Sequence, residues 1–461
     1  MKLLYRRCAG LDVHKKSITA CVRIRHSGKA EDEMAEQVFG TFTQDLERLA
    51  AWLKQHQVKQ VALESTGVYW IPVWNILEQR RWGLSLTLVN PQTVRALQGR
   101  KTDRIDARRI AEFLQYGMLA GSFIPPKPIR QARQLTRMRV HVQHDRNRVI
   151  NRIGRLLETV NIKLGSVASN IVGKSGRAIL NQLASGATDT LAMADLALGR
   201  LREKLPELAL ALNGRTDEHF RWMLTQLLTR LDELDRSLAS INQRLNTEMS
   251  QHSDLIQRLS TVPGIDTVSA QAILAELGDD MTQFPSSKHL ASWAGLCPGN
   301  AESAGKRFSG KTRKGDRYLR RILVQCAWAA SHKRDCFLSG LFHRLAGRRG
   351  VKKATVAVAH RLLIILYVLI RDGGIYREQG GDYFDRLHPE RTAKKMLRRL
   401  ERIGFEAILK RKPLLSVPIS LAVPAEVCSK CHRRRLATCT HDHPKPKRTN
   451  RKRKPEENSV T

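Results

Sequence analysis

Residues 8–13 read CAGLDV, an apolar run that contains a single acid, Asp12. After a short polar turn, residues 17–23 read SITACVR, and the two runs together predict a β-hairpin whose first strand lies centrally in a sheet. A carboxylate inside an apolar strand is costly unless a partner offsets its charge. Asp12 is therefore a candidate functional residue as well as a marker of the fold.

The chain that follows this hairpin alternates between strand and helix patterns. The predicted elements are a strand over 36–43, a helix over 44–57, a strand over 58–64, a helix over 68–82, a strand over 84–89 and a helix over 103–116. A hairpin followed by alternating helices and strands indicates an α/β sheet with helices on its faces.

Four acids in this region form the predicted site: Asp12, Glu64, Asp103 and Asp106. If the strands that carry Asp12 and Glu64 are neighbours, both carboxylates lie at the same end of the sheet. Asp103 and Asp106 are three residues apart and share one face of a helix. Phosphodiester cleavage commonly uses two hard cations about 3.5–4 Å apart, and such cations prefer carboxylate oxygens. Taken singly, an acid at a strand end is usually a cap or an ion-pair partner, and a helical acid among arginines usually belongs to a solvated face. His14 and Lys15 could approach phosphate, but residues in this position usually serve the hairpin turn.

The charge balance points to a polyanionic partner. The chain has 80 Lys and Arg against 43 Asp and Glu, a formal net charge of +37, which favours nucleic acid. The basic residues are spread through the chain and are not gathered on one amphipathic helix, so no membrane partner is expected. The N-terminus lacks a signal-peptide pattern, and the apolar run 362–370 is too short for a membrane span and predicts a buried helix. We expect a cytoplasmic, nucleoid-associated bacterial protein with reduced thiols.

From about residue 130 the helix pattern dominates. A heptad seam runs through Phe220, Leu224, Leu227, Leu231, Leu234, Leu238, Ile241 and Leu245. This spacing predicts a coiled coil, formed either within the chain against residues 130–160 or between protomers. The alternative is a single helix packed on a globular core. A later turn, Pro263-Gly264-Ile265, resembles half of a helix-hairpin-helix, or else is a plain connection between helices.

Two ordered sets of motifs resemble a known family. The motifs are GLDVHK (10–15), ESTG (64–67) and KTDRIDA (101–107), then PGI (263–265), AGLCPG (294–299), ESAGK (302–306) and KGDRYLR (314–320). Over residues 8–375 they look like the DEDD-type insertion-sequence transposases, insertion sequence family one-hundred-and-ten, which is related to the Piv pilin-gene invertase.

The resemblance implies three domains and an extension. It implies a RuvC-like (RNase H-like) α/β catalytic domain over 1–125, an all-α coiled-coil region over 126–252 and a small, mainly helical transposase domain over 253–375. It also implies that the four acids bind Mg and that a serine, here Ser303, is joined covalently to DNA during strand exchange. Expected partners are donor and target DNA, an element-encoded guide RNA, and further copies of the chain in a homodimer or homotetramer held by the coiled coil.

The residues around Ser303 fit this role less specifically than the acids fit theirs. A serine nucleophile needs a cationic cradle for phosphate, and the basic residues that could form it are Lys306, Arg307, Lys311, Arg313 and Lys314. Ser309 has nearly the same neighbours and is the rival. The alternative is a basic loop that holds the DNA backbone with neither serine reactive.

Residues 376–461 form an extension outside the family resemblance. Cys428, Cys431, Cys439 and His441 could form a small zinc knuckle, or could be reduced thiols in an exposed tail. Residues 443–457 predict a disordered basic tail.

The sequence therefore predicts a DNA transposase or recombinase that uses a magnesium site and a serine nucleophile. Two rivals make different predictions. A RuvC-like junction resolvase would cut with metal-activated water and would form no protein–DNA adduct. A non-catalytic nucleic-acid-binding protein would keep its activities without Asp12.

Overall fold

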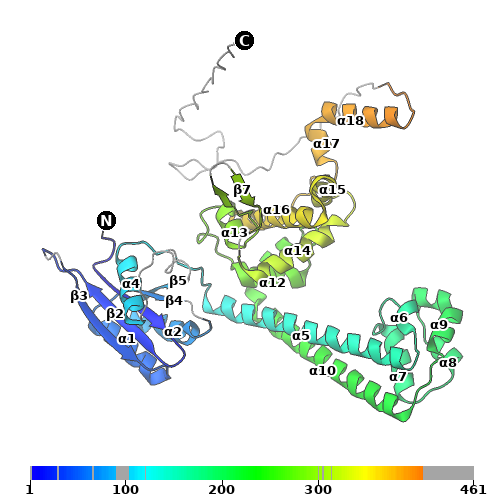
Figure 1. Cartoon of the computed structure of the whole chain (residues 1–461), viewed down its shortest axis with the longest axis horizontal. Coiled ribbons are helices and arrows are strands. Elements are labelled where there is room, and N and C mark those ends of the chain that lie inside the picture. Colours follow the sequence, from blue (N-terminus) through cyan, green and yellow to red (C-terminus); the bar gives the residue numbers. More distant parts are fainter. Residues whose placement is uncertain are drawn as a thin grey trace, which may run out of the picture.

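The computed structural model describes most of the chain and arranges it as a sheet domain, a long helical hairpin and a helical core (Figure 1). The described residues are 3–28, 31–64, 67–89, 103–119, 121–299, 301–303, 306–312 and 314–408, without the side chains of 103–105 and 301–309.

The N-terminal part is a five-stranded mixed sheet. Its strands are β1 (Arg7–Val13), β2 (Ile18–Ile24), β3 (Glu33–Phe39), β4 (Gln60–Glu64) and β5 (Ser85–Val89). Their order is β3-β2-β1-β4-β5, with β1 to β3 antiparallel and β1, β4 and β5 parallel. This arrangement fits the expected RNase H-like α/β fold, and each predicted strand is present within three residues of its predicted start.

Helices cover both faces of this sheet. On one face α1 (Thr43–Gln55) and α2 (Trp70–Leu77) share a core with the odd-numbered residues of β1, such as Leu11. On the other face α4 (Asp103–Gln115) packs against β1, β2 and β4. The helix predicted over 68–82 is shorter than expected. It ends at Leu77 because Gln79 has an extended backbone, and a short 3-10 helix, η1 (Arg80–Trp82), follows.

A long helical hairpin leads away from the sheet. It consists of α5 (Lys127–Thr159) and α10 (Glu218–Glu248), which run side by side in opposite directions (Figure 1). The tip between them contains α6 (Leu164–Val167), α7 (Lys174–Ala184), α8 (Thr190–Ala194), η2 (Gly199–Lys204) and α9 (Leu205–Leu212).

The predicted heptad seam of α10 faces α5 of the same chain. The buried residues of α10 are Phe220, Leu224, Leu228, Leu231, Leu234, Ile241 and Leu245. Leu227 and Leu238 of the predicted seam are only half-buried, and Leu228 takes the buried position in place of Leu227. A helix with 3.6 residues per turn drifts away from a strict heptad, and α7 also packs on this side of α10.

The C-terminal part is a helical core around α16 (Val351–Asp372). Its other helices are η3 (Ser250–His252), α11 (Ser253–Ser260), α12 (Thr267–Leu277), α13 (Ser287–Trp293), α14 (Arg317–Ser331) and α15 (Phe337–Arg349), followed by α17 (Tyr383–Leu387) and α18 (Pro389–Arg402). By length and composition alone, α16 could cross a membrane, but Leu362, Leu363 and Leu366 are fully buried in this core. The apolar run 362–370 is thus part of a buried helix, as predicted.

The Pro263-Gly264-Ile265 turn joins α11 to α12 and packs against α14. Gly264 has a φ of +84°, and a Cβ there would lie 2.3 Å from the carbonyl oxygen of Cys326. This close packing favours a plain helix connection over a phosphate-binding turn, because the turn is covered by another helix.

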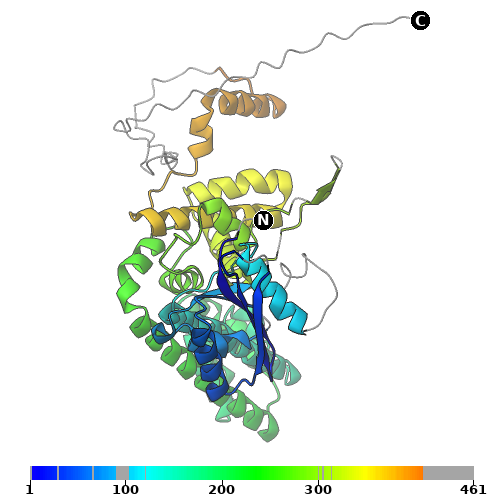
Figure 2. The ribbon, with the colours of Figure 1, turned by 90° about the vertical axis from the view of Figure 1, so that its left-hand side faces the viewer.

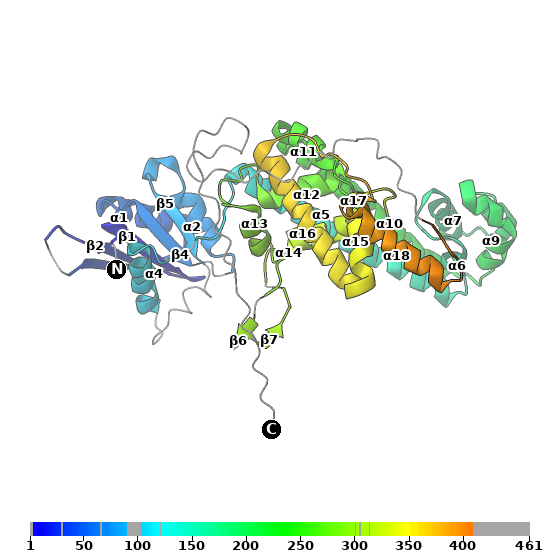
Figure 3. The same cartoon turned by 90° about the horizontal axis from the view of Figure 1, so that it is seen from above.

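Strands were not predicted in the C-terminal part. The residues around the predicted serine motif, for which a basic loop was the alternative, contain a two-stranded hairpin, β6 (Ala301–Ser303) and β7 (Lys306–Ser309). Figures 2 and 3 show it projecting from the helical core beside α13 and α14. Strands of three or four residues are too short to produce a recognisable period in the sequence.

Candidate functional site

Asp12 and Glu64 lie at the same edge of the sheet. β1 and β4 are parallel neighbours, and Leu11 stands opposite Leu63, so the next residue of each strand is one of the two acids. Asp12 is only 4% exposed, and Glu64 is the last residue of β4. The strands that carry the two acids are thus neighbours, which was the condition for the acids to share one end of the sheet.

The two acids also lie on the same face of the sheet, the face covered by α4. The Cys8 thiol donates to the carbonyl oxygen of Ala111 at 3.3 Å, and a Cβ on Gly10 would lie 2.3 Å from the carbonyl oxygen of Ala107. Side chains alternate along a strand, so Asp12 shares this face with Cys8 and Gly10. By the same alternation Glu64 shares the face of Ala62, which packs against α4.

The first turn of α4 comes level with Asp12. Cys8 meets Ala111 and Gly10 meets Ala107, so α4 runs antiparallel to β1. Two strand residues span about the length of four helix residues, given rises of about 3.3 Å and 1.5 Å per residue. Measured along the axis of β1, the backbone at Asp103, where α4 begins, is therefore the part of the helix closest to Asp12.

The side chains do not form a complete metal cage within the described residues. Asp106 is half-buried in the first turn of α4, and the side chain of Asp103 lies outside the described residues. In the part of the chain that the structure describes, no group of three or more His, Cys, Asp or Glu side chains is close enough to hold a metal ion. The fold thus brings the backbone of the four predicted positions to one corner of the sheet.

Two sets of polar contacts fix α4 on the sheet. Near its middle, the Arg108 guanidinium donates two hydrogen bonds to the Glu36 carboxylate on β3. At its end, the fully buried Gln115 donates to Asp32 at 3.3 Å and accepts from Arg23 at 3.2 Å. These contacts orient the helix whose first turn carries Asp103 and Asp106.

Asp32 is held as a carboxylate by two arginines. The Arg25 guanidinium bonds one of its oxygens, and Arg23 bonds the other at 2.6 Å. These hydrogen bonds, Arg25 first, lower the pKa of Asp32 to about 2. The carboxylate therefore stays charged over the whole physiological range.

His14 is a contact of Asp12 that the sequence left ambiguous. Its Nε2 lies 3.1 Å from Oδ2 of Asp12, and its backbone N–H donates to the carbonyl oxygen of Ser17 in the hairpin turn. The side chain is 44% exposed, so it can contact both the acid and solvent. His14 therefore serves the turn and also steadies the Asp12 carboxylate.

Cys8 and Cys21 lie under α4 on this face, but their thiols are not reactive nucleophiles. Burial raises the pKa of the Cys8 thiol to about 12 and does the same for Cys21. Because the thiolate is the reactive form, neither is a nucleophile near neutral pH. Both are packing residues of the sheet.

The two candidate serines lie at opposite ends of the β6–β7 hairpin. Ser303 ends β6 and stands opposite Lys306 next to the turn, whereas Ser309 ends β7 opposite Ala301. The hairpin is closed at its base by a bridge between Pro298 and Thr312. Ser303 is thus at the projecting end of the hairpin and Ser309 is near its base.

The predicted basic residues follow the same hairpin. Lys306 and Arg307 are in β7, Lys311 and Lys314 are exposed beyond its base, and Arg313 lies outside the described residues. Figures 1 and 3 show the β6–β7 hairpin and the N-terminal sheet on different parts of the molecule, so the hairpin that carries the candidate serines does not lie at the sheet edge.

The predicted zinc ligands cannot be placed. Cys428, Cys431, Cys439 and His441 all follow residue 408 and lie outside the described residues. The zinc knuckle therefore stays a prediction.

Two family models match separate parts of the chain. The DEDD-type IS110 transposase model matches residues 9–162, and the model for the transposase IS116/IS110/IS902 family matches residues 256–339. The first match contains Asp12, Glu64, Asp103 and Asp106, and the second contains Ser303 and Ser309.

Several curated proteins are similar along much of the chain. A probable family 20 transposase of Pseudomonas aeruginosa is 27% identical over 330 residues, which cover 69% of this chain and 85% of the relative. The transposase for insertion sequence element IS1111A of Coxiella burnetii is 26% identical and covers 64% of this chain and 74% of its own length. The pilin gene-inverting protein of Moraxella bovis is 29% identical over 37% of this chain and 51% of its own length.

Among solved structures, Thermus thermophilus RuvC matches with 15% identity and a TM-score of 0.21, over 25% of this chain and 99% of that chain. The same protein in complex with a Holliday junction substrate matches with 14% identity and the same TM-score, over 26% of this chain and 100% of that chain.

Proposed function

This chain belongs to the DEDD transposases of the IS110 family, and from that premise we propose that it cleaves and rejoins DNA strands, with its metal site at the corner formed by β1, β4 and α4. The observation that carries the proposal is the placement of Asp12 and Glu64. They lie at the carboxyl ends of adjacent parallel strands, on the face that α4 covers, with the first turn of α4 at the same level.

The donor chemistry at this corner fits a hard divalent cation such as magnesium. The nearby groups are carboxylates, whose oxygens hard cations prefer, and Asp12 is 4% exposed with Nε2 of His14 3.1 Å from its Oδ2. We propose that Asp12, Glu64, Asp103 and Asp106 would hold the metal. When bound, magnesium would stabilise charge on the phosphoryl oxygens and favour deprotonation of the attacking group.

We further propose Ser303 as the nucleophile. Its Oγ would form a bond to phosphorus while the bond from phosphorus to the leaving deoxyribose oxygen breaks, and the serine proton would end on that oxygen. A hydroxyl of the incoming strand would then attack the phosphoserine ester and restore the serine hydroxyl. Support comes from the place of Ser303 at the projecting end of a hairpin that carries Lys306 and Arg307. Such residues can neutralise phosphate.

The guide RNA and the oligomer are proposals that come from the family alone. The α10 seam is already covered by α5 of the same chain, so an oligomer would have to use another surface or exchange helices. RNase treatment of the purified protein, followed by a cleavage assay, tests whether RNA is needed.

The decisive experiment looks for a denaturant-resistant protein–DNA adduct with element-end DNA, magnesium and co-purified RNA. It compares the wild type with Asp12→Asn, Ser303→Ala and Ser309→Ala. The control is Asp195→Asn, which removes an exposed carboxylate in the hairpin tip. We expect the adduct to be lost in Asp12→Asn and Ser303→Ala and kept in the other two variants.

The other outcomes separate the rivals. An adduct kept in Ser303→Ala but lost in Ser309→Ala moves the nucleophile to the base of the hairpin. Cleavage without an adduct that survives both serine changes indicates a resolvase-like nuclease. Adduct and cleavage that survive Asp12→Asn overturn the proposed site altogether.

A further inference from the structure

One face of α5 carries a row of cationic and imidazole side chains. The buried residues of α5, among them Ile129, Ala132 and Ile153, lie on one side of the helix. The residues on the opposite side recur at helical spacing, and they are Arg137, His141, His144, Arg148, Arg152 and Arg155. Except for Arg137, all of them are exposed.

Residues at the start of α14 lie beside this row and add further cationic side chains to it. Tyr318 Oη lies 3.5 Å from Nε2 of His141, and Arg321 donates a hydrogen bond to Nε2 of His144. Arg317 lies 4.9 Å from the centre of the Tyr318 ring. We call the set formed by His141, His144, Arg148, Arg152, Arg155, Arg317 and Arg321 the α5–α14 stripe.

The positive charge of the stripe is largely uncompensated. Arg148 pairs with Asp145 at 2.9 Å, but that pair is exposed to solvent. Arg152, Arg155, Arg317 and Arg321 form no salt bridge with any described residue. Four guanidinium groups along one surface repel one another unless an external anion neutralises them.

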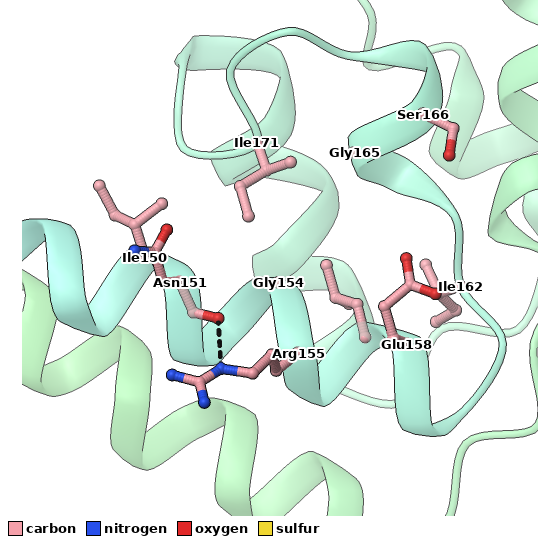
Figure 4. Close-up of a pocket in the computed structure, with 10 residues that line it drawn as sticks. Ile150, Asn151, Gly154, Arg155, Glu158, Ile162, Gly165, Ser166 and Ile171 are labelled. Carbon is pink, nitrogen blue, oxygen red and sulfur yellow. Dashed lines mark hydrogen bonds between the residues drawn. The ribbon is translucent and has the colours of Figure 1, made fainter.

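The far end of the stripe borders an open hollow of about 670 Å³ (Figure 4). Arg155 lines it from α5, where its Nε donates to the carbonyl oxygen of Asn151 at 3.4 Å. Gly154 lines it too, and a Cβ there would lie 3.8 Å from Ile171, an ordinary contact. Glycine is unfavourable inside a helix, and packing does not require it at this position.

We propose that the α5–α14 stripe binds the phosphate backbone of duplex DNA that flanks the cleaved strand. The inference rests on the proposed function, which makes DNA the substrate. From His141 to Arg155 the helix spans about 21 Å, the length of about six base pairs. Tyr318 is the aromatic residue beside the stripe, and Arg137 and Arg317 both lie over its ring, at 4.3 Å and 4.9 Å from its centre. Because these guanidinium groups already occupy the ring, it is not available for stacking with a base. The stripe therefore suits contact with the DNA backbone.

The test measures DNA affinity as a function of salt concentration, with the full-length protein and a DNA duplex. The test variant combines Arg148→Gln, Arg152→Gln and Arg155→Gln. The control combines Arg230→Gln, Arg236→Gln and Arg244→Gln, which removes the same charge from α10 of the same hairpin. We expect the slope of log affinity against log salt to fall by about two to three in the test variant, since each phosphate contact contributes about 0.9. The control is expected to keep the wild-type slope.

Equal slopes in the wild type and the test variant would overturn the inference, and so would equal losses in the test and control variants. The same measurements with an RNA duplex of the same sequence distinguish DNA from RNA as the ligand. A reduced slope for the RNA duplex alone would also overturn the assignment to DNA. Asp12→Asn separates this inference from the proposed function. This variant is expected to keep the wild-type slope of DNA binding. A loss of its DNA cleavage would concern the proposed metal site and not the stripe.

Discussion

Arg137 on α5 and Glu276 on α12 form a bidentate ion pair, with two hydrogen bonds of 2.8 Å between the guanidinium and the carboxylate. The Glu276 side chain is 1% exposed, and Arg133 reaches it as well at 3.0 Å. Arg137 also lies 3.5 Å from Asp316, which caps the start of α14. This cluster joins the long helix to the helical core and sets where the α5–α14 stripe lies.

Glu276→Ala should destabilise the protein strongly. The change leaves the mostly buried guanidinium of Arg133 without its carboxylate and removes the bidentate partner of the half-buried Arg137, which keeps its contact with Asp316. Removing one partner of a buried pair costs about 3–5 kcal/mol. Denaturant unfolding measures the loss, with Glu233→Ala as the control, because Glu233 pairs with Arg230 on the surface of α10. The two variants losing equal stability would contradict this account.

Gly10→Ala should weaken the contact between β1 and α4. The added Cβ would lie 2.3 Å from the carbonyl oxygen of Ala107 and 2.4 Å from the amide of Ala111, so the helix must shift. Overpacking of this kind costs about 1–3 kcal/mol. We expect a lower melting temperature and reduced DNA cleavage, because the shift displaces the first turn of α4 from Asp12.

Gly347→Ala in α15 is the matched control for that change. No atom lies within 4 Å of a Cβ at this position, so the change should be neutral or stabilise by about 0.5–1 kcal/mol. Gly10→Ala behaving like Gly347→Ala would contradict the close packing of α4 on β1.

Asp32 should make stability depend on pH in the acid range. Its pKa is lowered to about 2 in the folded protein, from an ordinary value of 3.8. The unfolded state therefore binds the proton more readily as pH falls, so the stabilisation is complete above about pH 4 and is lost toward about pH 2. Asp32→Asn should lower the melting temperature near neutral pH, and its difference from the wild type should shrink through this window. A constant difference would show that Asp32 acts through packing alone.

Magnesium should raise the melting temperature of the wild type if the four acids bind it in the folded state only. The shift should grow with metal concentration, as expected for a ligand that binds the native state. Asp12→Asn is expected to remove most of the shift, and Asp195→Asn, far out in the hairpin tip, to keep it. The same shift in all three proteins would mean that the metal binds elsewhere. This measurement needs neither DNA nor RNA.

The thiols beneath α4 should resist alkylation. Cys8 and Cys21 are fully buried, and burial raises the pKa of each to about 12. Iodoacetamide should therefore label the half-buried Cys297 before either of them in the native protein, as peptide mass spectrometry can measure. Prompt labelling of Cys8 would show that α4 leaves the sheet readily.

Local patterns in the sequence were enough to predict the α/β sheet and its acids. The strands and helices of residues 7–115 leave local signals over consecutive residues, such as the apolar run of β1 and the helical period of α1, and the order of the elements restricts the topology. Asp12 and Glu64 were recognisable because a charged residue interrupts or ends an apolar strand. The β6–β7 hairpin was missed because three or four residues carry no such period.

Contacts between distant residues were decided only by the tertiary structure. The heptad pattern predicted a packed helix, but it could not distinguish α5 from a helix of another protomer as its partner. The tertiary structure also buries Leu228 in place of Leu227, on the side of α10 where α7 packs. Arg137 and Glu276 are 139 positions apart, and nothing local to either residue pairs them. Hydrophobic periodicity depends on neighbours along the chain, so the sequence by itself determined the elements and the candidate acids. Two features depend on how whole elements pack, and only the tertiary structure decides them. They are the position of the first turn of α4 along β1, beside Asp12, and the partner of each buried charge.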